Sequence, residues 1–191
     1  EVLALVVAPR VGIERHGAIE VLLGLPGAVV DGERGIDQPG VDAVLDRLAA
    51  VTGETGLLVG FVGENKSRPG REVNNAVALL HRGKIVATRA KTLLPTYDVF
   101  DEDRYFQPGA GNNPAVFNRR KVGLTICEDI WNDEDFWPER RYRNNPPVEL
   151  AEAGAQIIFN VSASPWHLGK NKTRFEMLRS LAVKTKRPVV F

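Results

Sequence analysis

The chain of 191 residues has very few of the residue types that build disulfides and metal centres. It contains one cysteine and three histidines, and these residues form no CxxC or HxxxH spacing. One cysteine cannot form an internal disulfide, and it excludes a multi-cysteine metal site. We therefore expect no metal centre and a reducing, cytoplasmic setting.

Strong charge of one sign and long apolar runs are also missing. The formal net charge is only +1, so bulk charge indicates neither a nucleic-acid partner nor a membrane partner. No apolar run approaches the roughly 20 residues of a membrane helix, and the run at 3–8 is too short for the core of a signal peptide. Because the first residue is not Met and the chain ends inside an apolar run at 189–191, we expect a piece of a longer polypeptide.

The residues that are present suit a folded domain in which strands and helices alternate. Hydrophobic residues make up 43% of the chain and charged residues 26%, which allows a sizeable core and a polar surface. Since hairpins interrupt the alternation, we expect an α/β fold with a mixed sheet. The helix expected at 171–184 would turn Phe175, Leu178, Leu181 and Ala182 inward. The other expected elements are strands at 3–8, 57–62, 155–161 and 189–191, hairpins formed by 73–80 with 84–88 and by 116–117 with 122–126, and helices at 41–51 and 147–153.

The only cysteine stands in the stretch GLTICEDIW, where an expected strand ends and a polar loop begins. Such positions collect catalytic residues in α/β folds, because the strand fixes the side chain and the loop leaves it accessible. Two acids, Glu128 and Asp129, follow Cys127 directly, and like charge raises a thiol's pKa. An inert core thiol is the commonest fate of a lone cysteine, and at this point both interpretations stay open.

A nucleophilic thiol needs a base and a nearby positive charge, and two residues are candidates. His167 is the only histidine in a plausible position, and histidine is the usual partner of a nucleophile. Lys91 lies between an expected strand and a long irregular segment, where its ammonium group would lower the pKa of the thiol. The plain alternative for Lys91 is a solvated surface lysine.

Three blocks of sequence resemble a known family. They are KTLLPTYDVFDEDRYFQPG at 91–109, GLTICEDIW at 123–131 and NVSASPWHLGK at 160–170. Together they resemble the amidohydrolase domain of the nitrilase superfamily, and most of all the glutaminase domain of glutamine-dependent NAD⁺ synthetases. The resemblance implies an αββα sandwich with mixed sheets, incomplete at both ends. It makes residues 1–191 a partial carbon–nitrogen hydrolase domain from which the synthetase domain is absent.

The resemblance also implies a glutamate–lysine–cysteine triad that hydrolyses the side-chain amide of glutamine. Cys127 would be the nucleophile, ammonia would leave, and water would release glutamate from a thioester. Lys91 matches the lysine that stabilises the tetrahedral oxyanion, together with backbone N–H groups beside the cysteine. A fixed cation aimed at a developing oxyanion contributes about 3–4 kcal/mol in favourable sites.

Four further positions match the glutamine-binding groups of that family. Tyr97 would wall the pocket, Glu128 would receive the α-ammonium group, and Ser164 with Lys170 would handle the α-amino-acid end. A carboxylate that binds the ammonium group of the substrate would explain why an acid stands beside the thiol. The plain alternatives are ordinary packing for Tyr97, a turn before a proline for Ser164, and a solvated helix start for Lys170. In the DEDRYF stretch, we expect Arg104 to form a structural ion pair that anchors the loop.

One position departs from the family. The family's general base is a glutamate just after an early buried strand, and Arg10 stands at that position here. Arginine cannot accept a proton near neutral pH. The alignment could shift so that Glu14 or Glu20 serves, the chain could have lost hydrolysis, or its N-terminal region could be altered. Glu14 is the candidate base that we name, and a solvated surface acid is its plain alternative.

The resemblance finally implies partners and cofactors. The domain itself would need no cofactor, whereas ATP and Mg²⁺ would belong to the missing synthetase domain. The expected partners are glutamine, a C-terminal synthetase domain or subunit, and further copies of the chain in a homo-oligomer. Two alternatives stay open: a stand-alone carbon–nitrogen hydrolase acting on another amide or a nitrile, and a non-catalytic scaffold domain that lacks the base.

Overall fold

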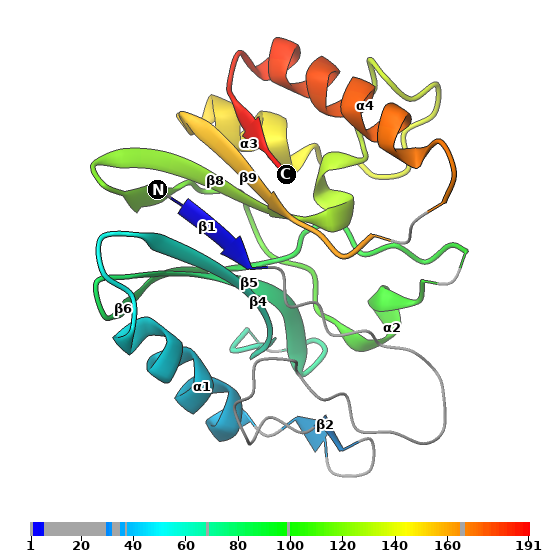
Figure 1. Ribbon diagram of the computed structural model, residues 1–191. Helices are drawn as coiled ribbons and strands as arrows, with labels where there is room; N and C mark the ends of the chain where they lie inside the picture. The colour runs from blue at the N-terminus through cyan, green and yellow to red at the C-terminus, as the bar shows by residue number, and fades with distance from the viewer. Residues whose placement is uncertain are drawn as a thin grey trace.

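A computed structural model describes residues 2–5, 30–31, 35–36, 38–67, 69–98, 100–164 and 167–191. Two four-stranded sheets lie face to face between helices, giving the layer order helix, sheet, sheet, helix (Figure 1). The first sheet has the order β1 (Val2–Leu5), β4 (Gly56–Glu64), β5 (Val73–His81), β6 (Lys84–Ala90). The second has the order β10 (Val189–Val190), β9 (Ile157–Val161), β8 (Arg120–Ile126), β7 (Ala115–Phe117).

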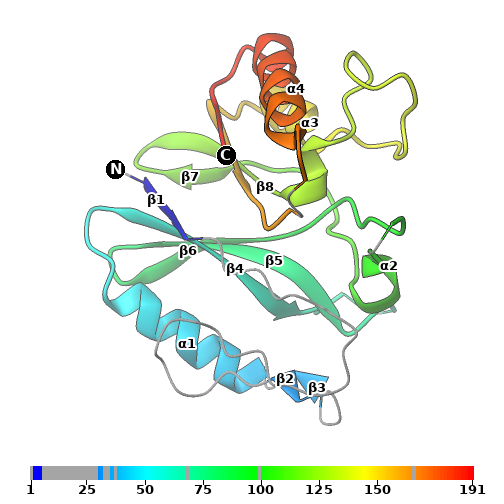
Figure 2. The same cartoon turned by 45° about the vertical axis from the view of Figure 1, so that its right-hand side comes forward.

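The remaining elements cover these sheets or connect them. Helix α1 (Gln38–Ala50) lies on the outer side of the first sheet, and α3 (Pro146–Glu152) and α4 (Lys170–Thr185) lie on the outer side of the second (Figure 2). The short elements are α2 (Glu102–Tyr105), the 3₁₀ helix η1 (Cys127–Ile130), and a small antiparallel pair of β2 (Val30–Asp31) and β3 (Gly35–Ile36). This arrangement confirms the expected αββα sandwich.

Both sheets are mixed, as the alternation of hairpins and helices predicted. In the first sheet β1 runs parallel to β4, whereas β4, β5 and β6 are antiparallel. In the second sheet β8, β9 and β10 are parallel and β7 is antiparallel to β8. The β5–β6 hairpin turns at Arg82 and Gly83, whose φ angles of 48° and 75° are both positive, as a two-residue turn of type I′ requires.

The second half of the central strand β5 is buried on both faces, which explains the unbroken apolar run from Ala76 to Leu80. Val77 and Leu79 face the second sheet and belong to the core between the sheets. Ala78 and Leu80, one position along in each case, pack instead against Leu45 of α1. Alternate side chains of a strand point to opposite faces, so a strand between two layers needs apolar residues at every position.

Helix α4 corrects one detail of the expected core. Met177 and Leu181 are fully buried, whereas Phe175 keeps 64% of its surface exposed. Residues four apart share one face of a helix, so Met177 and Leu181 point inward together. Phe175 is two positions from Met177, roughly 200° round the helix, and the expectation that it points inward is wrong. Among the described helices, none combines the length and apolar character that crossing a bilayer requires.

Candidate active site

Cys127 occupies a strained turn at the end of β8. It is the first residue of η1, and its backbone φ of +44° lies in the left-handed region. That conformation costs a residue with a side chain about 1–3 kcal/mol, and it persists only where neighbours hold it. Here the Asp129 carboxylate accepts the Ile126 N–H at 2.9 Å, and the Asn160 side-chain amide donates to the Cys127 carbonyl at 3.4 Å. The thiol residue is half-buried, so it is not sealed in the core.

The sheet register sets the thiol beside the end of β9. Ile126 pairs with Val161 in the parallel ladder, so Cys127 and Ser162 follow the two strands at neighbouring positions. The Ser162 hydroxyl is buried and has no conventional hydrogen-bond partner among the described residues. It lies close enough to the thiol to lower the thiol's pKa.

Lys91 is a buried lysine held by a carboxylate. Its side chain is only 1% exposed, and its Nζ donates to the two carboxylate oxygens of Glu102 at 2.7 and 2.8 Å. Its backbone is fixed as well, because the Lys91 N–H donates to Asn75 O at 2.7 Å and its carbonyl accepts the Gly109 N–H at 2.8 Å. The solvated-surface interpretation of this lysine is therefore wrong.

Asp129 links the segment after Lys91 to the turn that carries the thiol. One carboxylate oxygen accepts the backbone N–H groups of Thr92 and Leu93 at 3.0 and 2.8 Å, and the other accepts the Ile126 N–H. Asp129 is 2% exposed, and its burial raises its pKa to about 6 against these stabilising hydrogen bonds. This acid therefore acts as a clamp between two chain segments.

The charges around Cys127 partly offset one another. Burial raises the pKa of the Cys127 thiol above its ordinary value, and the nearby Lys91 ammonium group lowers it. Glu102 and Glu128 raise the same pKa by smaller amounts. The resting thiol is therefore protonated near neutral pH, and Lys91 is the cation placed to favour the thiolate.

Glu128 is held by two tyrosine hydroxyls. Its Oε1 accepts the Tyr97 hydroxyl at 2.7 Å and the Tyr142 hydroxyl at 3.2 Å, and the residue is 5% exposed. Burial raises the pKa of Glu128, while both tyrosines, Lys91 and Arg141 lower it. Burial, and then the neighbouring Glu128 carboxylate, raise the pKa of both Tyr97 and Tyr142. Glu128 is a fixed acceptor within electrostatic reach of the thiol.

Ser164 and Lys170 meet at the same site. The Lys170 Nζ donates to Ser164 Oγ at 2.5 Å and lies 5.4 Å from the centre of the Trp131 ring. Burial and then Arg174 lower the pKa of Lys170, whereas Cys127, Glu128 and Asp98 raise it. The structure thus brings together six of the residues selected from the sequence, namely Lys91, Tyr97, Cys127, Glu128, Ser164 and Lys170.

Other candidates fall elsewhere. Glu14 and Arg10 lie outside the described residues. His167 is exposed, and within the described part of the chain its ring makes a hydrogen-bond contact with the carbonyl of Leu168 rather than with the thiol. Arg104 is 69% exposed in a 3.9 Å contact with Asp101, and a contact between exposed side chains contributes little stability. The expected ion pair of Arg104 is thus present, but as an exposed local contact it anchors the loop only weakly.

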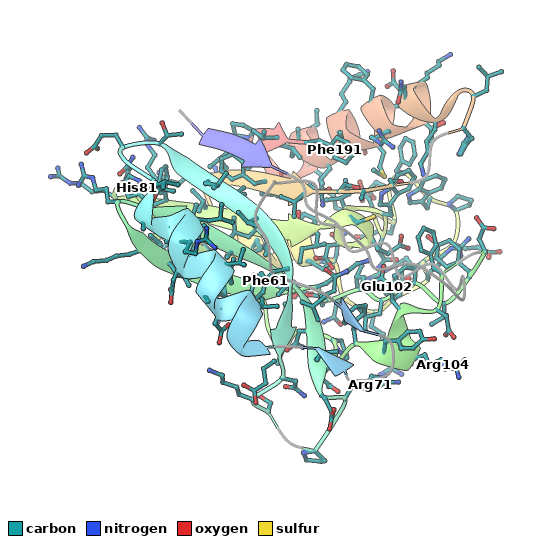
Figure 3. All side chains as sticks on the ribbon, turned by 60° about the horizontal axis from the view of Figure 1, so that its bottom comes forward. Phe61, Arg71, His81, Glu102, Arg104 and Phe191 are labelled. Atoms are coloured by element: carbon teal, nitrogen blue, oxygen red, sulfur yellow. The ribbon has the colours of Figure 1, made fainter. Side chains whose placement is uncertain are left out.

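The carboxylate that matters in that stretch is Glu102. Its side chain is 17% exposed and faces the interior, whereas Arg104 lies at the periphery (Figure 3). Sequence reasoning missed Glu102, although it stands in the DEDRYF stretch that drew attention for Arg104, and it also missed Tyr142. One sequence signal could have indicated Glu102. A lysine that is buried needs an acid as its partner, and the DEDRYF stretch contains three acidic residues. Among the described residues, no group of three or more His, Cys, Asp or Glu side chains could hold a metal ion.

The fold and the site together indicate a class of protein. An αββα sandwich with a half-buried thiol at a strand end and a buried lysine acting on that thiol resembles nitrilase-like proteins. The family model described as Carbon-nitrogen hydrolase matches residues 31–191. The chain belongs to the carbon–nitrogen hydrolase family.

The chain is also similar in sequence to curated proteins that share one name. The chain is 41% identical over 117 residues to a glutamine-dependent NAD(+) synthetase of Synechocystis sp., covering 61% of this chain and 21% of that protein. It is 38% identical over 122 residues to a protein of the same name from Thermotoga maritima, covering 64% of this chain and 19% of the relative. The chain thus spans about a fifth of the length of the curated relatives that it matches.

Solved structures agree on the fold. A glutamine-dependent NAD+ synthetase from Acinetobacter baumannii, solved in complex with ADP, matches with a TM-score of 0.67 and 27% identity over 80% of this chain and 26% of that one. A carbon-nitrogen hydrolase from Helicobacter pylori G27 matches with a TM-score of 0.60 over 78% of this chain and 49% of that one. Its identity is 22%, so it supports the fold alone.

Proposed function

We propose that this chain is a glutamine amidohydrolase domain in which Cys127 attacks the side-chain amide and Lys91 stabilises the oxyanion. The observation that carries the proposal is the buried Lys91–Glu102 pair, whose ammonium group acts electrostatically on the Cys127 thiol. A buried ammonium group is costly unless it is paired, so a functional demand explains why one is kept next to the only cysteine. The similarity to proteins named glutamine-dependent NAD(+) synthetase supports glutamine as the amide.

The chemistry divides one difficult step into two easier ones. The thiol loses its proton, and the thiolate sulfur bonds to the amide carbon while the carbonyl oxygen gains the negative charge beside Lys91. The C–N bond then breaks, the nitrogen takes up the proton, and ammonia leaves a thioester. Water attacks the thioester carbon, the C–S bond breaks, and glutamate and the thiol are restored. The sum is one amide and one water converted to one carboxylate and one ammonium ion.

The proton on the thiol needs a carrier. Of the described carboxylates, Glu102 alone contacts Lys91 by hydrogen bonds and also acts on the thiol. We assign the proton transfer to Glu102, which also holds the Lys91 ammonium group. Glu14, proposed from the sequence, lies outside the described residues and is tested by its own variant. Losing a general base typically lowers the rate by about 10²–10⁴-fold.

The remaining assignments follow from the relatives and are proposals as well. Residues 1–191 would form part of a carbon–nitrogen hydrolase domain that passes ammonia to a synthetase domain or subunit, for the conversion of deamido-NAD⁺ to NAD⁺. ATP and Mg²⁺ would act in that synthetase part. A cytoplasmic homo-oligomer is the expected form of the assembly.

The decisive experiment measures glutamate and ammonia released from glutamine, together with covalent labelling by a glutamine-analogue electrophile. We expect release by the parent chain, labelling at Cys127, and loss of both in Cys127→Ala. Lys91→Met and Glu102→Gln should lower release by at least about 10²-fold, whereas Lys172→Met, at an exposed lysine, should leave it unchanged. Comparable release in Glu14→Gln assigns the proton transfer to Glu102. Equal turnover of a nitrile would overturn the choice of glutamine, and no labelling would favour a scaffold domain.

A further inference from the structure

The loop between η1 and α3 brings two residues to the site that no sequence argument assigned. Tyr142 donates its hydroxyl to Glu128 Oε1 at 3.2 Å. Arg141 lies with its guanidinium carbon 3.8 Å from the centre of the Tyr97 ring, and Tyr97 donates to the same Glu128 oxygen at 2.7 Å. An arginine, two tyrosines and a buried carboxylate therefore form one cluster beside the thiol residue.

Hydrogen bonds to a buried side chain hold this loop in one conformation. The buried Asn132 side chain accepts the backbone N–H groups of Arg141 and Tyr142 at 3.1 and 3.2 Å. Its amide nitrogen donates to the carbonyls of Tyr142 and Asn144 at 2.8 and 2.7 Å. Four hydrogen bonds from one side chain that is 2% exposed fix the loop, so Arg141 and Tyr142 are pre-positioned next to Glu128.

The Arg141 guanidinium still has its hydrogen-bonding capacity. Within the described part of the chain, its side-chain N–H groups form no hydrogen bond and no ion pair, and its contact is the face of Tyr97. A guanidinium carries five N–H donors in a flat fork that matches a carboxylate. Stacking on an aromatic ring orients the fork and leaves its edge available. Arg141 also lowers the pKa of Glu128, which places the positive charge close to this acid.

A cation and a carboxylate side by side match one chemical class of ligand, the α-amino-acid group. We propose that Arg141 binds the α-carboxylate of the substrate and that Tyr142 positions Glu128 to receive its α-ammonium group. This inference rests on the proposed function, because it deepens the substrate recognition of the same site. It makes the 138–144 loop the element that distinguishes glutamine from simple amides. Lys170, whose Nζ donates to Ser164 Oγ, is then a second cation of the site.

The test compares three amides that differ only at the α-carbon. Glutamine carries both charges, 4-aminobutanamide lacks the carboxylate, and 4-carbamoylbutanoate lacks the amine. In Arg141→Met we expect KM for glutamine and for 4-carbamoylbutanoate to rise about 10- to 100-fold, the effect of losing hydrogen bonds between charged groups, with kcat within about threefold. KM for 4-aminobutanamide should not change. Arg141→Lys keeps the charge but not the fork, so its effect should be intermediate.

Two further variants complete the design. Tyr142→Phe should raise KM for glutamine and 4-aminobutanamide and spare 4-carbamoylbutanoate. Arg143→Met, at an exposed arginine two residues further along, should behave as the parent on all three amides. A uniform rise in KM for all three amides in Arg141→Met would reveal a structural role and overturn the inference, as would no change for glutamine.

A binding measurement separates this inference from the proposed function. L-glutamate, 4-aminobutanoate and glutarate are titrated calorimetrically into the parent chain and Arg141→Met. We expect Arg141→Met to weaken binding of L-glutamate and glutarate about 10-fold or more and to spare 4-aminobutanoate. That pattern without ammonia release from glutamine would refute the hydrolysis and support the subsite. No binding of L-glutamate by the parent chain would overturn the subsite, and ammonia release with equal binding by both proteins would overturn it while sparing the hydrolysis.

Discussion

Replacing Glu102 with glutamine tests the pair on which the site depends. The substitution keeps the shape of the side chain and one oxygen acceptor, but it removes the negative charge that faces Lys91. The Lys91 side chain is 1% exposed and that of Glu102 is 17% exposed, so water reaches the ammonium group poorly. The variant therefore leaves a buried positive charge without its counterion.

The expected loss of stability follows from that burial. Breaking a buried ion pair by removing one partner costs about 3–5 kcal/mol, because the other charge stays desolvated. Glutamine retains a hydrogen bond to the ammonium group, so we expect the lower end, about 3 kcal/mol. A domain of this size is stable by only about 5–15 kcal/mol. With a slope of about 1–3 kcal/mol per molar urea, the unfolding midpoint should fall by at least about 1 M.

A double variant distinguishes the charge from the shape of the pair. In Glu102→Gln with Lys91→Met both charges are gone, and replacing a buried pair by uncharged groups is often neutral. We expect most of the stability to return, while amide hydrolysis stays at least about 10²-fold below the parent because the oxyanion has lost its cation. Urea unfolding followed by fluorescence and an ammonia assay measure the two effects. A single variant as stable as the parent, or a double variant no more stable than the single one, would refute the reasoning.

Three shorter predictions concern other parts of the structure. The folded state binds a proton at Asp129 with a pKa of about 6, above the value of about 3.9 in an unfolded chain. Stability of the parent relative to Asp129→Asn should therefore fall by about 3 kcal/mol as pH rises from about 3 to 7. A pH-independent difference in urea unfolding would contradict this. Burial raises the pKa of Cys127, so the rate of its alkylation by iodoacetamide should still increase above about pH 9. Lys91→Met should lower that rate at pH 8. A rate that levels off below pH 8 would show that the thiol pKa is not raised. Met177→Ala should lower the free energy of unfolding by about 2–5 kcal/mol, whereas Phe175→Ala should change it by no more than about 0.5 kcal/mol. Similar losses for the two variants in thermal unfolding would mean that α4 packs through a different face.

Much of the fold was predictable because apolar spacing records which faces are covered. The strand expected at 73–80 forms β5, and the structure shows that the second sheet and α1 cover the two faces of its apolar half. The short turn after His81 predicted the hairpin to β6. The helical pattern of α4 was also recognised, and Leu178 and Leu181 pack in the core as expected, whereas Phe175 does not. An aromatic residue on a surface is common, and spacing alone does not say which apolar residue a neighbour covers.

The candidate site was likewise only partly predictable from the sequence. The sequence by itself determined that a lone cysteine follows a strand and that a lysine, a tyrosine and an acid stand in blocks resembling one family. Only the tertiary structure decided that Glu102 pairs with Lys91, that Asp129 is a backbone clamp, and that Arg141 and Tyr142 turn back to Glu128. The physical reason is that partners of buried charges come from irregular loops, whose paths follow from packing and hydrogen bonds between distant segments and leave no periodic trace in the sequence.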